Sequence, residues 1–308
     1  MAVDLVTGAF SYSGRFLTES LLSDRHEVRT LTNHPRPEVF GDRVVVHPLR
    51  FDADFLTQVL SGVGTVYNTY WIRFPYGNLD FQVAVRNSAA LIRAARRAGV
   101  GRFVHVSIAN PSVDSPHPYY RGKAAVEEDL TRSGLSYAIV RPTVLYGEGD
   151  VLMNNIGWFI RHLPVFGIPG SGRYRIRPAF VRDHVALMRR VATLDEDVVL
   201  DSVGPDGYTF DELLRMMRSA LQGRTVFVKL PAPLVLVALR VVGALVHDVI
   251  LTDHEIGALM DDLLISHGEP TCPTRFDTWL HSHADELGRQ FASELDRHFK
   301  PSPRRQQG

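Results

Sequence analysis

Residues 3–22 constrain the fold most, because they join a short apolar run to an amphipathic pattern through a glycine turn. Val3 to Val6 reads as a buried strand that Gly8 interrupts. Ser13-Gly14 then opens a helical pattern with one apolar face, formed by Phe16, Leu17, Leu21 and Leu22. Such a turn lets the backbone approach a phosphate, and the helix N-terminus directs N–H groups and its positive dipole end at that charge. The stretch predicts a pyrophosphate-binding turn, with an ordinary strand-to-helix turn as the alternative.

Strands and helices alternate through the first half of the chain. Apolar runs predict strands at residues 27–32, 44–49, 65–70, 103–107 and 137–140. Apolar periodicity predicts helices at residues 87–99 and 120–131. This alternation favours an α/β fold with a Rossmann-type doubly wound parallel sheet, which binds ligands beyond the carboxyl ends of its strands. Residues 198–202 could return to this sheet.

The alternation of predicted strands and helices becomes irregular after Pro142, where glycines and prolines are frequent. We expect a dinucleotide-binding Rossmann domain over residues 1–205, including a loop-rich substrate segment at 147–182. A small, mostly helical C-terminal substrate lobe follows at 206–300, and a disordered tail at 301–308. Helices are predicted in this lobe at 210–221, from Pro233, from a capping box at Thr252, and at 276–298.

Composition excludes several classes of protein. The 308 residues have a formal net charge of zero, so no global field attracts nucleic acid, and we expect no nucleic-acid partner. The single cysteine, Cys272, cannot form an intramolecular disulfide, which is typical of a reducing cytoplasm. The 13 histidines show no metal-binding spacing, so no metal is expected. No basic stretch precedes the first strand, so we expect no signal peptide.

The most apolar stretch is Leu230 to Leu251. Two prolines and three polar or charged residues interrupt it, namely Pro231, Pro233, Arg240, His247 and Asp248. We therefore expect no transmembrane segment here. A buried or interfacial helix is the favoured interpretation, and peripheral membrane association is the less favoured one.

Tyr119 and Lys123 stand four residues apart at the start of a predicted helix, so they share one face. A cation beside a phenol stabilises the phenolate and lowers its pKa, which suits Tyr119 to proton transfer near neutral pH. Ser107 closes the preceding strand, and its hydroxyl could polarise a substrate carbonyl. The alternative is an exposed helix turn, because this spacing occurs often by chance.

The order of glycine turn, strand-ending serine and Tyr-x-x-x-Lys resembles the extended and atypical short-chain dehydrogenase/reductase superfamily. Residues 99–107, 140–147 and 177–185 carry further resemblance. The sequence is most similar to the NmrA-like and complex-I-accessory-subunit-like branch, grouped with NAD-dependent epimerase/dehydratase relatives. The resemblance covers residues 3 to about 215.

The resemblance implies a set of site residues. The catalytic set would be Ser107, Tyr119 and Lys123. The pyrophosphate would be lined by Gly8, Phe10, Ser11, Tyr12 and Gly14. Asp52 would meet the adenine edge, and the cofactor ribose would be flanked by Asn68, Thr69 and Tyr70, with Lys123 able to hold its hydroxyls. Pro142 and Val144 would border the nicotinamide, and the substrate pocket would include Asn154, Asn155 and Trp158. Two departures stand out: Ser11 replaces a glycine, and Tyr70-Trp71 is bulky.

The loop after the second predicted strand discriminates between cofactors. An NAD-preferring site usually places an acid there, but Thr32-Asn33-His34-Pro35-Arg36 has none before Glu38. Arg36 or Arg15 could pair with a 2′-phosphate, with Asn33 nearby. NADP(H) is therefore favoured, NAD(H) remains possible, and the alternative is that Arg36 is a solvated loop charge.

These observations predict an NAD(P)-dependent oxidoreductase or epimerase/dehydratase that acts on a small organic carbonyl or alcohol. The main alternative is a non-catalytic NAD(P)-binding sensor or assembly protein, as among the NmrA-like and complex-I-accessory relatives. A nucleotide-independent interaction module is the least favoured reading. A homodimer could form through the helices at 87–99 and 120–131.

Overall fold

The computed structural model describes residues 2–295, and these form two compact units. The first unit contains the chain through Arg141 together with Val185–Leu200, and the second contains Pro142–His184 and Asp201–Leu295. This division differs from the predicted boundary at residue 205, because the loop-rich segment after Pro142 groups with the C-terminal part. The predicted tail at 301–308 lies outside the described residues.

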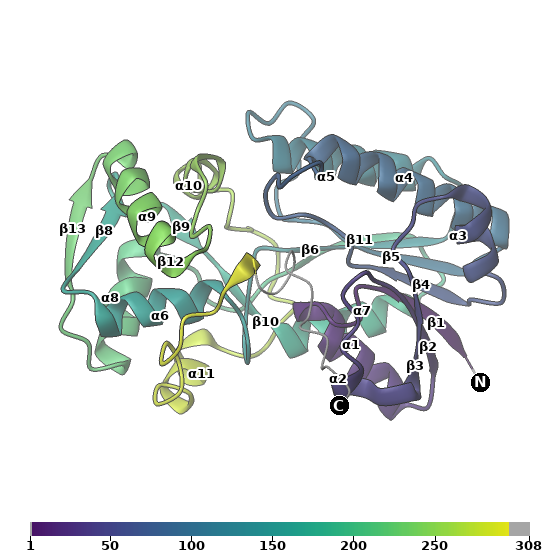
Figure 1. Cartoon of the computed structure of the whole chain (residues 1–308), viewed down its shortest axis with the longest axis horizontal. Helices are drawn as coiled ribbons and strands as arrows, with labels where there is room; N and C mark the ends of the chain where they lie inside the picture. Colours follow the sequence, from purple (N-terminus) through teal and green to yellow (C-terminus); the bar gives the residue numbers. More distant parts are fainter. Residues whose placement is uncertain (1, 296–308) are drawn as a thin grey trace, which may run out of the picture. The chain divides into compact units, whose positions relative to one another are not determined.

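A seven-stranded sheet forms the centre of the first unit, in the order β11-β6-β5-β4-β1-β2-β3 (Figure 1). Strands β1 to β6 pair in parallel. The strands are β1 Val3–Thr7, β2 Glu27–Leu31, β3 Val44–His47, β4 Thr65–Asn68, β5 Arg102–Val106, β6 Tyr137–Pro142 and β11 Val198–Ser202. The predicted Rossmann-type fold is confirmed, and the strand order reverses between β1 and β4, where such sheets bind ligands.

Helices cover both faces of this sheet. Figure 1 shows α3, α4 and α5 on one face and α1 on the other. The helices of this part are α1 Tyr12–Ser23, α2 Pro37–Phe40, the 3-10 turn Gly41–Arg43, α3 Ala53–Val59, α4 Phe81–Ala98, α5 Pro118–Thr131 and, from Val185 onward, α7 Val181–Ala192. Buried Leu91 and Val126 pack with Phe103 of β5, so α4 and α5 are held by apolar contact with the sheet. Helix α4 starts six residues before the predicted helix, because the Asp80 side chain caps it by accepting from Val83 N.

The second unit combines helices with three two-stranded sheets, β7–β10, β8–β13 and β9–β12. Its strands are β7 Val144–Tyr146, β8 Val165–Pro169, β9 Arg175–Ile176, β10 Pro178–Phe180, β12 Tyr208–Thr209 and β13 Val226–Leu230. Its helices are α6 Leu152–His162, α8 Phe210–Ala220, α9 Ala232–Val246, α10 Asp253–Met260 and α11 Phe276–Ser282. Thr209 and Thr252 form capping boxes at α8 and α10, and the capping box predicted at Thr252 is confirmed.

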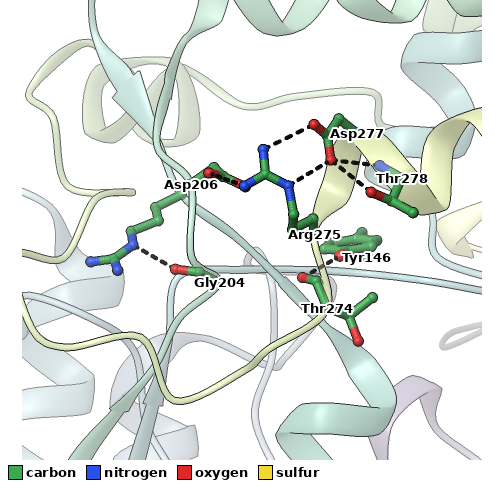
Figure 2. A network of polar contacts seen from close by, with 8 residues as sticks. Tyr146, Gly204, Asp206, Thr274, Arg275, Asp277 and Thr278 are labelled. Atoms are coloured by element: carbon green, nitrogen blue, oxygen red, sulfur yellow. Dashed lines mark hydrogen bonds and ion pairs between the residues drawn. The ribbon is translucent and has the colours of Figure 1, made fainter.

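A polar network fixes the loop that leads into α11 (Figure 2). Arg275 lies between Asp206 and Asp277, at 3.0 Å from a carboxylate oxygen of each. The hydroxyl of buried Tyr146 donates to the carbonyl of Thr274 at 3.0 Å. These contacts anchor the loop beside the aromatic core of this unit, where the Tyr146, Phe276 and Trp279 rings pack together.

The helix predicted at 276–298 is wrong beyond Ser282. The described chain turns at Gly288, which has a φ of +73°, and passes close against α6. A Cβ at Gly288 would lie 2.3 Å from the carbonyl carbon of Gly157, so only glycine fits there. Residues 296–298 lie outside the described range.

Among residues 2–295, no helix has the length and apolar composition needed to cross a bilayer. The apolar stretch that starts at Leu230 forms the end of β13 and the helix α9. One face of α9 is buried at Val235 and Gly243, while the opposite face is exposed. The expectation of a buried helix therefore holds for one face of α9 only.

Candidate cofactor and catalytic site

The turn between β1 and α1 is tight and needs glycine at two positions. Gly8 has a φ of +75°, a conformation that favours glycine, and Ser11 N donates to Gly8 O at 2.8 Å. A Cβ at Gly14 would lie 2.1 Å from Gly8 O, so residue 14 must also be glycine. The turn therefore closes tightly onto α1, whose first-turn N–H groups lack acceptors within the helix.

The serine that replaces a glycine in this turn faces the two remaining glycines. A Cβ at Gly14 would lie 2.8 Å from Ser11 Oγ, and one at Gly8 would lie 3.4 Å from it. The hydroxyl therefore occupies space beside the glycine Cα atoms, and it makes no capping bond to α1. Neighbouring aromatic side chains pack against other rings. The ring centroids of Phe10 and Phe40 are 5.6 Å apart, and the Tyr12 ring lies edge-on to that of Phe16.

The loop after β2 contains the residues predicted to select the cofactor. Asn33 accepts from Leu49 N at 2.9 Å and so ties this loop to the chain after β3. Arg36 is half-buried and directly precedes α2, while Arg15 lies in α1 with its guanidinium 4.7 Å from the Phe16 ring centroid. Asp52, predicted at the adenine edge, is exposed and caps α3 through a bond from Phe55 N.

Three side chains at the ends of neighbouring strands form a buried polar ladder. Thr7 Oγ1 donates to Asn68 Oδ1 at 3.1 Å, and Asn68 Nδ2 donates to His105 Nδ1 at 3.1 Å. Burial, and then the nearby Lys123, hold the pKa of His105 well below its ordinary value, so the imidazole is neutral. The backbone N–H groups of Thr69 and Tyr70 both donate to Thr7 Oγ1.

The ladder places the predicted Asn68, Thr69 and Tyr70 at the carboxyl ends of the strands. Sequence reasoning missed Thr7 and His105. Their signal was available, because each is a polar residue at or near the end of an apolar strand. Tyr70 is also held by a 2.8 Å bond from Asn87 Nδ2 of α4 to its hydroxyl.

Ser107 directly follows β5 and is only 2% exposed. Its N–H donates to Val140 O at 2.8 Å, while its buried Oγ has no hydrogen-bond partner within residues 2–295. A buried hydroxyl without a partner carries a desolvation cost, and a ligand oxygen or nitrogen could remove that cost.

Lys123 is also 2% exposed, and its Nζ donates to Val106 O at 2.7 Å. Burial lowers the pKa of Lys123 to about 7, and the negative charge of Glu127 opposes this change. Glu127 itself pairs with Arg141 at 2.9 Å. Lys123 can therefore gain or lose a proton near neutral pH.

Trp71, the bulky departure noted in the sequence, lies against both catalytic candidates of α5. Lys123 Nζ lies 4.5 Å from an indole centroid, and the Tyr119 ring lies edge-on to the indole at 5.9 Å. Phe81 completes the group at 5.8 Å from Tyr119. A Cβ at Gly122 would lie 3.0 Å from the indole, so this glycine makes room for it. Tyr119 and Lys123 thus share one aromatic neighbour.

The remaining predicted site residues, which lie between Pro142 and Trp158, belong to the second unit. Pro142 ends β6 and Val144 is buried in β7. The side chain of Asn154 bonds to backbone atoms of Gly288 and Gln290. Asn155 accepts from Ala292 N and donates to Ala292 O, both at 2.9 Å. The ring of Trp158 stacks on His162 and meets Phe291 edge-on. All three side chains thereby hold the segment after α11 or pack beside it, and their substrate role stays a prediction.

Across the described range, no group of three or more histidine, cysteine, aspartate or glutamate side chains is arranged to hold a metal ion. The first unit does fit a dinucleotide. Gly8 is half-buried with a φ of +75° just before α1, and the buried Ser107 hydroxyl has no partner within residues 2–295 at the same edge of the sheet. Both features lie where parallel sheets bind ligands.

Comparison with known proteins agrees with this geometry. A family model described as NAD(P)H-binding matches residues 8–154. NADH dehydrogenase (ubiquinone) 1 alpha subcomplex subunit 9, mitochondrial, from Arabidopsis thaliana is 29% identical over 248 residues, which cover 75% of this chain and 61% of that protein. The match thus spans about three fifths of that relative's length.

Two further matches extend over most of both chains. A ceramide reductase from Caulobacter vibrioides is 28% identical over 260 residues, covering 78% of this chain and 76% of that protein. The crystal structure of the NADPH-dependent quinone oxidoreductase QOR2 from Escherichia coli aligns with a TM-score of 0.70 at 20% identity, covering 91% of this chain and 99% of that one. The chain thus contains a domain that matches the NAD(P)H-binding family model, and it shares its fold with solved epimerase and reductase structures.

Proposed function

We propose that this protein is an NAD(P)-dependent oxidoreductase or epimerase/dehydratase acting on a small organic carbonyl or alcohol. One observation carries the proposal: Lys123, whose pKa is about 7, shares the indole of Trp71 with Tyr119. Its Nζ donates to Val106 O, next to a Ser107 hydroxyl that has no partner among residues 2–295. Such groups are what proton transfer to or from a substrate oxygen requires.

Each residue has a distinct part in this chemistry. Tyr119 holds the proton that the substrate oxygen gains in reduction or loses in oxidation. Lys123, buried beside it in α5, stabilises the phenolate when protonated. The Ser107 hydroxyl donates to the substrate oxygen and so gains the partner that it lacks among the described residues. A bound nicotinamide would supply or accept the hydride.

The cofactor favoured by this proposal is NADP(H). Two observations support this preference. No aspartate or glutamate lies between Leu31 at the end of β2 and Glu38, and Arg36 directly precedes α2. A guanidinium can bind a 2′-phosphate through two hydrogen bonds. Titrations of NADPH and NADH test this. Arg36→Ala should weaken NADPH binding by about tenfold and leave NADH binding unchanged. Equal weakening of both cofactors would contradict the assignment.

Turnover tests the catalytic part. The names of the ceramide reductase and of the quinone oxidoreductase suggest a panel of long-chain ketones and quinones as first substrates. Tyr119→Phe should abolish turnover while leaving cofactor affinity intact, because it removes one hydroxyl and keeps the ring contacts with Trp71 and Phe81. Retained turnover in this variant would contradict the proposed role of Tyr119.

The alternative is a non-catalytic NAD(P)-binding sensor or assembly protein. The similarity to a complex I subunit supports it. Tight cofactor binding without turnover on any substrate would favour this alternative, and no cofactor binding would favour an interaction module. The proposed compartment is a reducing one such as the cytoplasm, given one buried cysteine. The proposed homodimer through α4 and α5 predicts a dimeric mass in size-exclusion chromatography.

A further inference from the structure

Helix α9 exposes an unusually apolar face. Leu234, Val237, Val241 and Leu245 recur at helical spacing, and each is between 55% and 75% exposed. Ala238 and Ala244 are exposed on the same side. The opposite side packs into the second unit through Val235, close to the Cα of Gly167 and beside Leu230. Helix α9 is thus anchored on one face and offers an aliphatic stripe on the other.

The two-stranded sheet under α9 extends this surface. Val165 of β8 pairs in register with Val226 of β13, and Val228 pairs with Gly167, so these residues lie on the face that carries α9. Val165, Val226 and Val228 are each more than a third exposed. The other face is covered, because Phe166 and Phe227 pack with each other, with Phe159 of α6 and under Arg218 of α8.

The chain segment that contains β13 and α9 is basic. From Leu213 to His247 the sequence contains no aspartate or glutamate but five basic residues, Arg215, Arg218, Arg224, Lys229 and Arg240. Arg224 and Arg240 are exposed and form no ion pair with any described residue, whereas Lys229 alternates with Val228 along β13 and so lies on the opposite face. On the helical repeat, Arg240 falls at the margin of the aliphatic stripe. An aliphatic surface bordered by unpaired cations matches the chemistry of an anionic lipid bilayer.

We propose that α9 and the Val165–Val226–Val228 face form the surface, here called the α9 face, that binds an anionic phospholipid membrane. The helix has 15 residues, about 22 Å at ~1.5 Å per residue, which is shorter than the roughly 30 Å hydrocarbon core of a bilayer. It therefore lies in the plane of the interface, with its aliphatic stripe inserted among the acyl chains and its cations at the headgroups.

The composition of the α9 face favours lipid over protein as the occupant. Protein interfaces are enriched in aromatic side chains, but the exposed side chains of α9 include none. A second copy of the chain would bring the basic residues of both copies to one interface, because a two-fold interface pairs the same patch with itself. That repulsion disfavours self-association through this face.

Vesicle flotation with the full-length chain tests the proposal. We expect the protein to float with vesicles of phosphatidylcholine and phosphatidylglycerol, and less with phosphatidylcholine alone, and to dissociate as salt is raised. Val241→Glu should reduce the bound fraction by about tenfold, because it places a charge within the aliphatic stripe. Val113→Glu is the matched control: Val113 is an exposed valine of the first unit, and its substitution should leave flotation unchanged.

Folding and self-association are controlled in the same experiment. Both variants should retain the wild-type circular dichroism spectrum, and Leu245→Glu replaces Val241→Glu if the latter misfolds. No flotation of the wild-type protein, or equal flotation of Val241→Glu and Val113→Glu, would overturn the proposal. A dimer in sedimentation velocity that Val241→Glu dissociates, without vesicle binding, would overturn it in favour of a second copy on the α9 face.

Discussion

Lys123 Nζ lies 4.5 Å from the centroid of an indole ring of Trp71, inside the first unit. Trp71 has two opposing effects on the charged form of Lys123. The π-face attracts the charged ammonium, whereas the bulk of the ring excludes the water that would solvate it. Burial lowers the pKa of Lys123 to about 7, and the indole is one of the groups that bury the ammonium. Trp71 therefore helps to set the proton equilibrium of the proposed catalytic lysine.

Replacing Trp71 by alanine should raise the pKa of Lys123 toward its ordinary value, because water would reach the ammonium. The pH dependence of Lys123 acylation, followed by mass spectrometry, measures this pKa. Its midpoint should move upward by at least one unit, about 1.4 kcal/mol. Trp158→Ala, in the second unit, is the control and should leave the midpoint near 7. An unchanged midpoint in Trp71→Ala would show that other groups desolvate the lysine.

Lys123→Met should stabilise the protein at neutral pH. The pKa of Lys123 is about 7 in the fold and 10.5 as its ordinary value, so between these values the unfolded chain binds more protons and wild-type stability rises with pH. The variant should lack this rise and exceed the wild type by a few kcal/mol near pH 7, on the order of the shift itself. Denaturant unfolding across this pH range measures the difference.

The exposed Lys229 provides the control for that experiment. Lys229→Met should keep the wild-type dependence of stability on pH. A stability gain for Lys123→Met that persists undiminished at pH 11 would refute the desolvation account, because both states of the wild type are then largely deprotonated at this position.

Gly14→Ala should abolish NADPH and NADH binding and destabilise the protein by about 1–3 kcal/mol. The reason is steric, since the added Cβ would lie 2.1 Å from Gly8 O and force the turn open. Gly64→Ala is the matched control, because a Cβ there would meet nothing closer than Val3 O at 3.7 Å. Isothermal titration and thermal unfolding measure both effects. Normal cofactor affinity in Gly14→Ala would place the pyrophosphate elsewhere.

Asn155→Ala should lower the free energy of unfolding by about 1–3 kcal/mol, because the backbone N–H and carbonyl of Ala292 would both lose their partner. Turnover measurements separate this role from the predicted substrate role. A raised KM with unchanged stability would indicate that Asn155 contacts substrate. A loss of stability with unchanged KM would assign it to holding the segment after α11.

The fold class of the first unit could be predicted from the sequence because its signals are local. A strand, a glycine turn and an amphipathic helix each depend on residues close in the chain, as in residues 3–22. The predicted strands match those of the sheet to within a few residues, and Thr252 caps its helix as expected. The helix predicted at 276–298 failed because Gly288 meets Gly157 of α6, a contact that no local pattern contains.

The sequence by itself determined the residues of the candidate site and their order, since the Tyr119–Lys123 spacing follows from the helical repeat. Only the tertiary structure decided their environment. It buried Lys123 under Trp71, left the Ser107 hydroxyl without a partner in the described chain, and linked Thr7 to His105 through Asn68. It also turned one side of α9 outward. Burial and long-range contacts set pKa values and exposed surfaces, and both arise only when distant segments pack together.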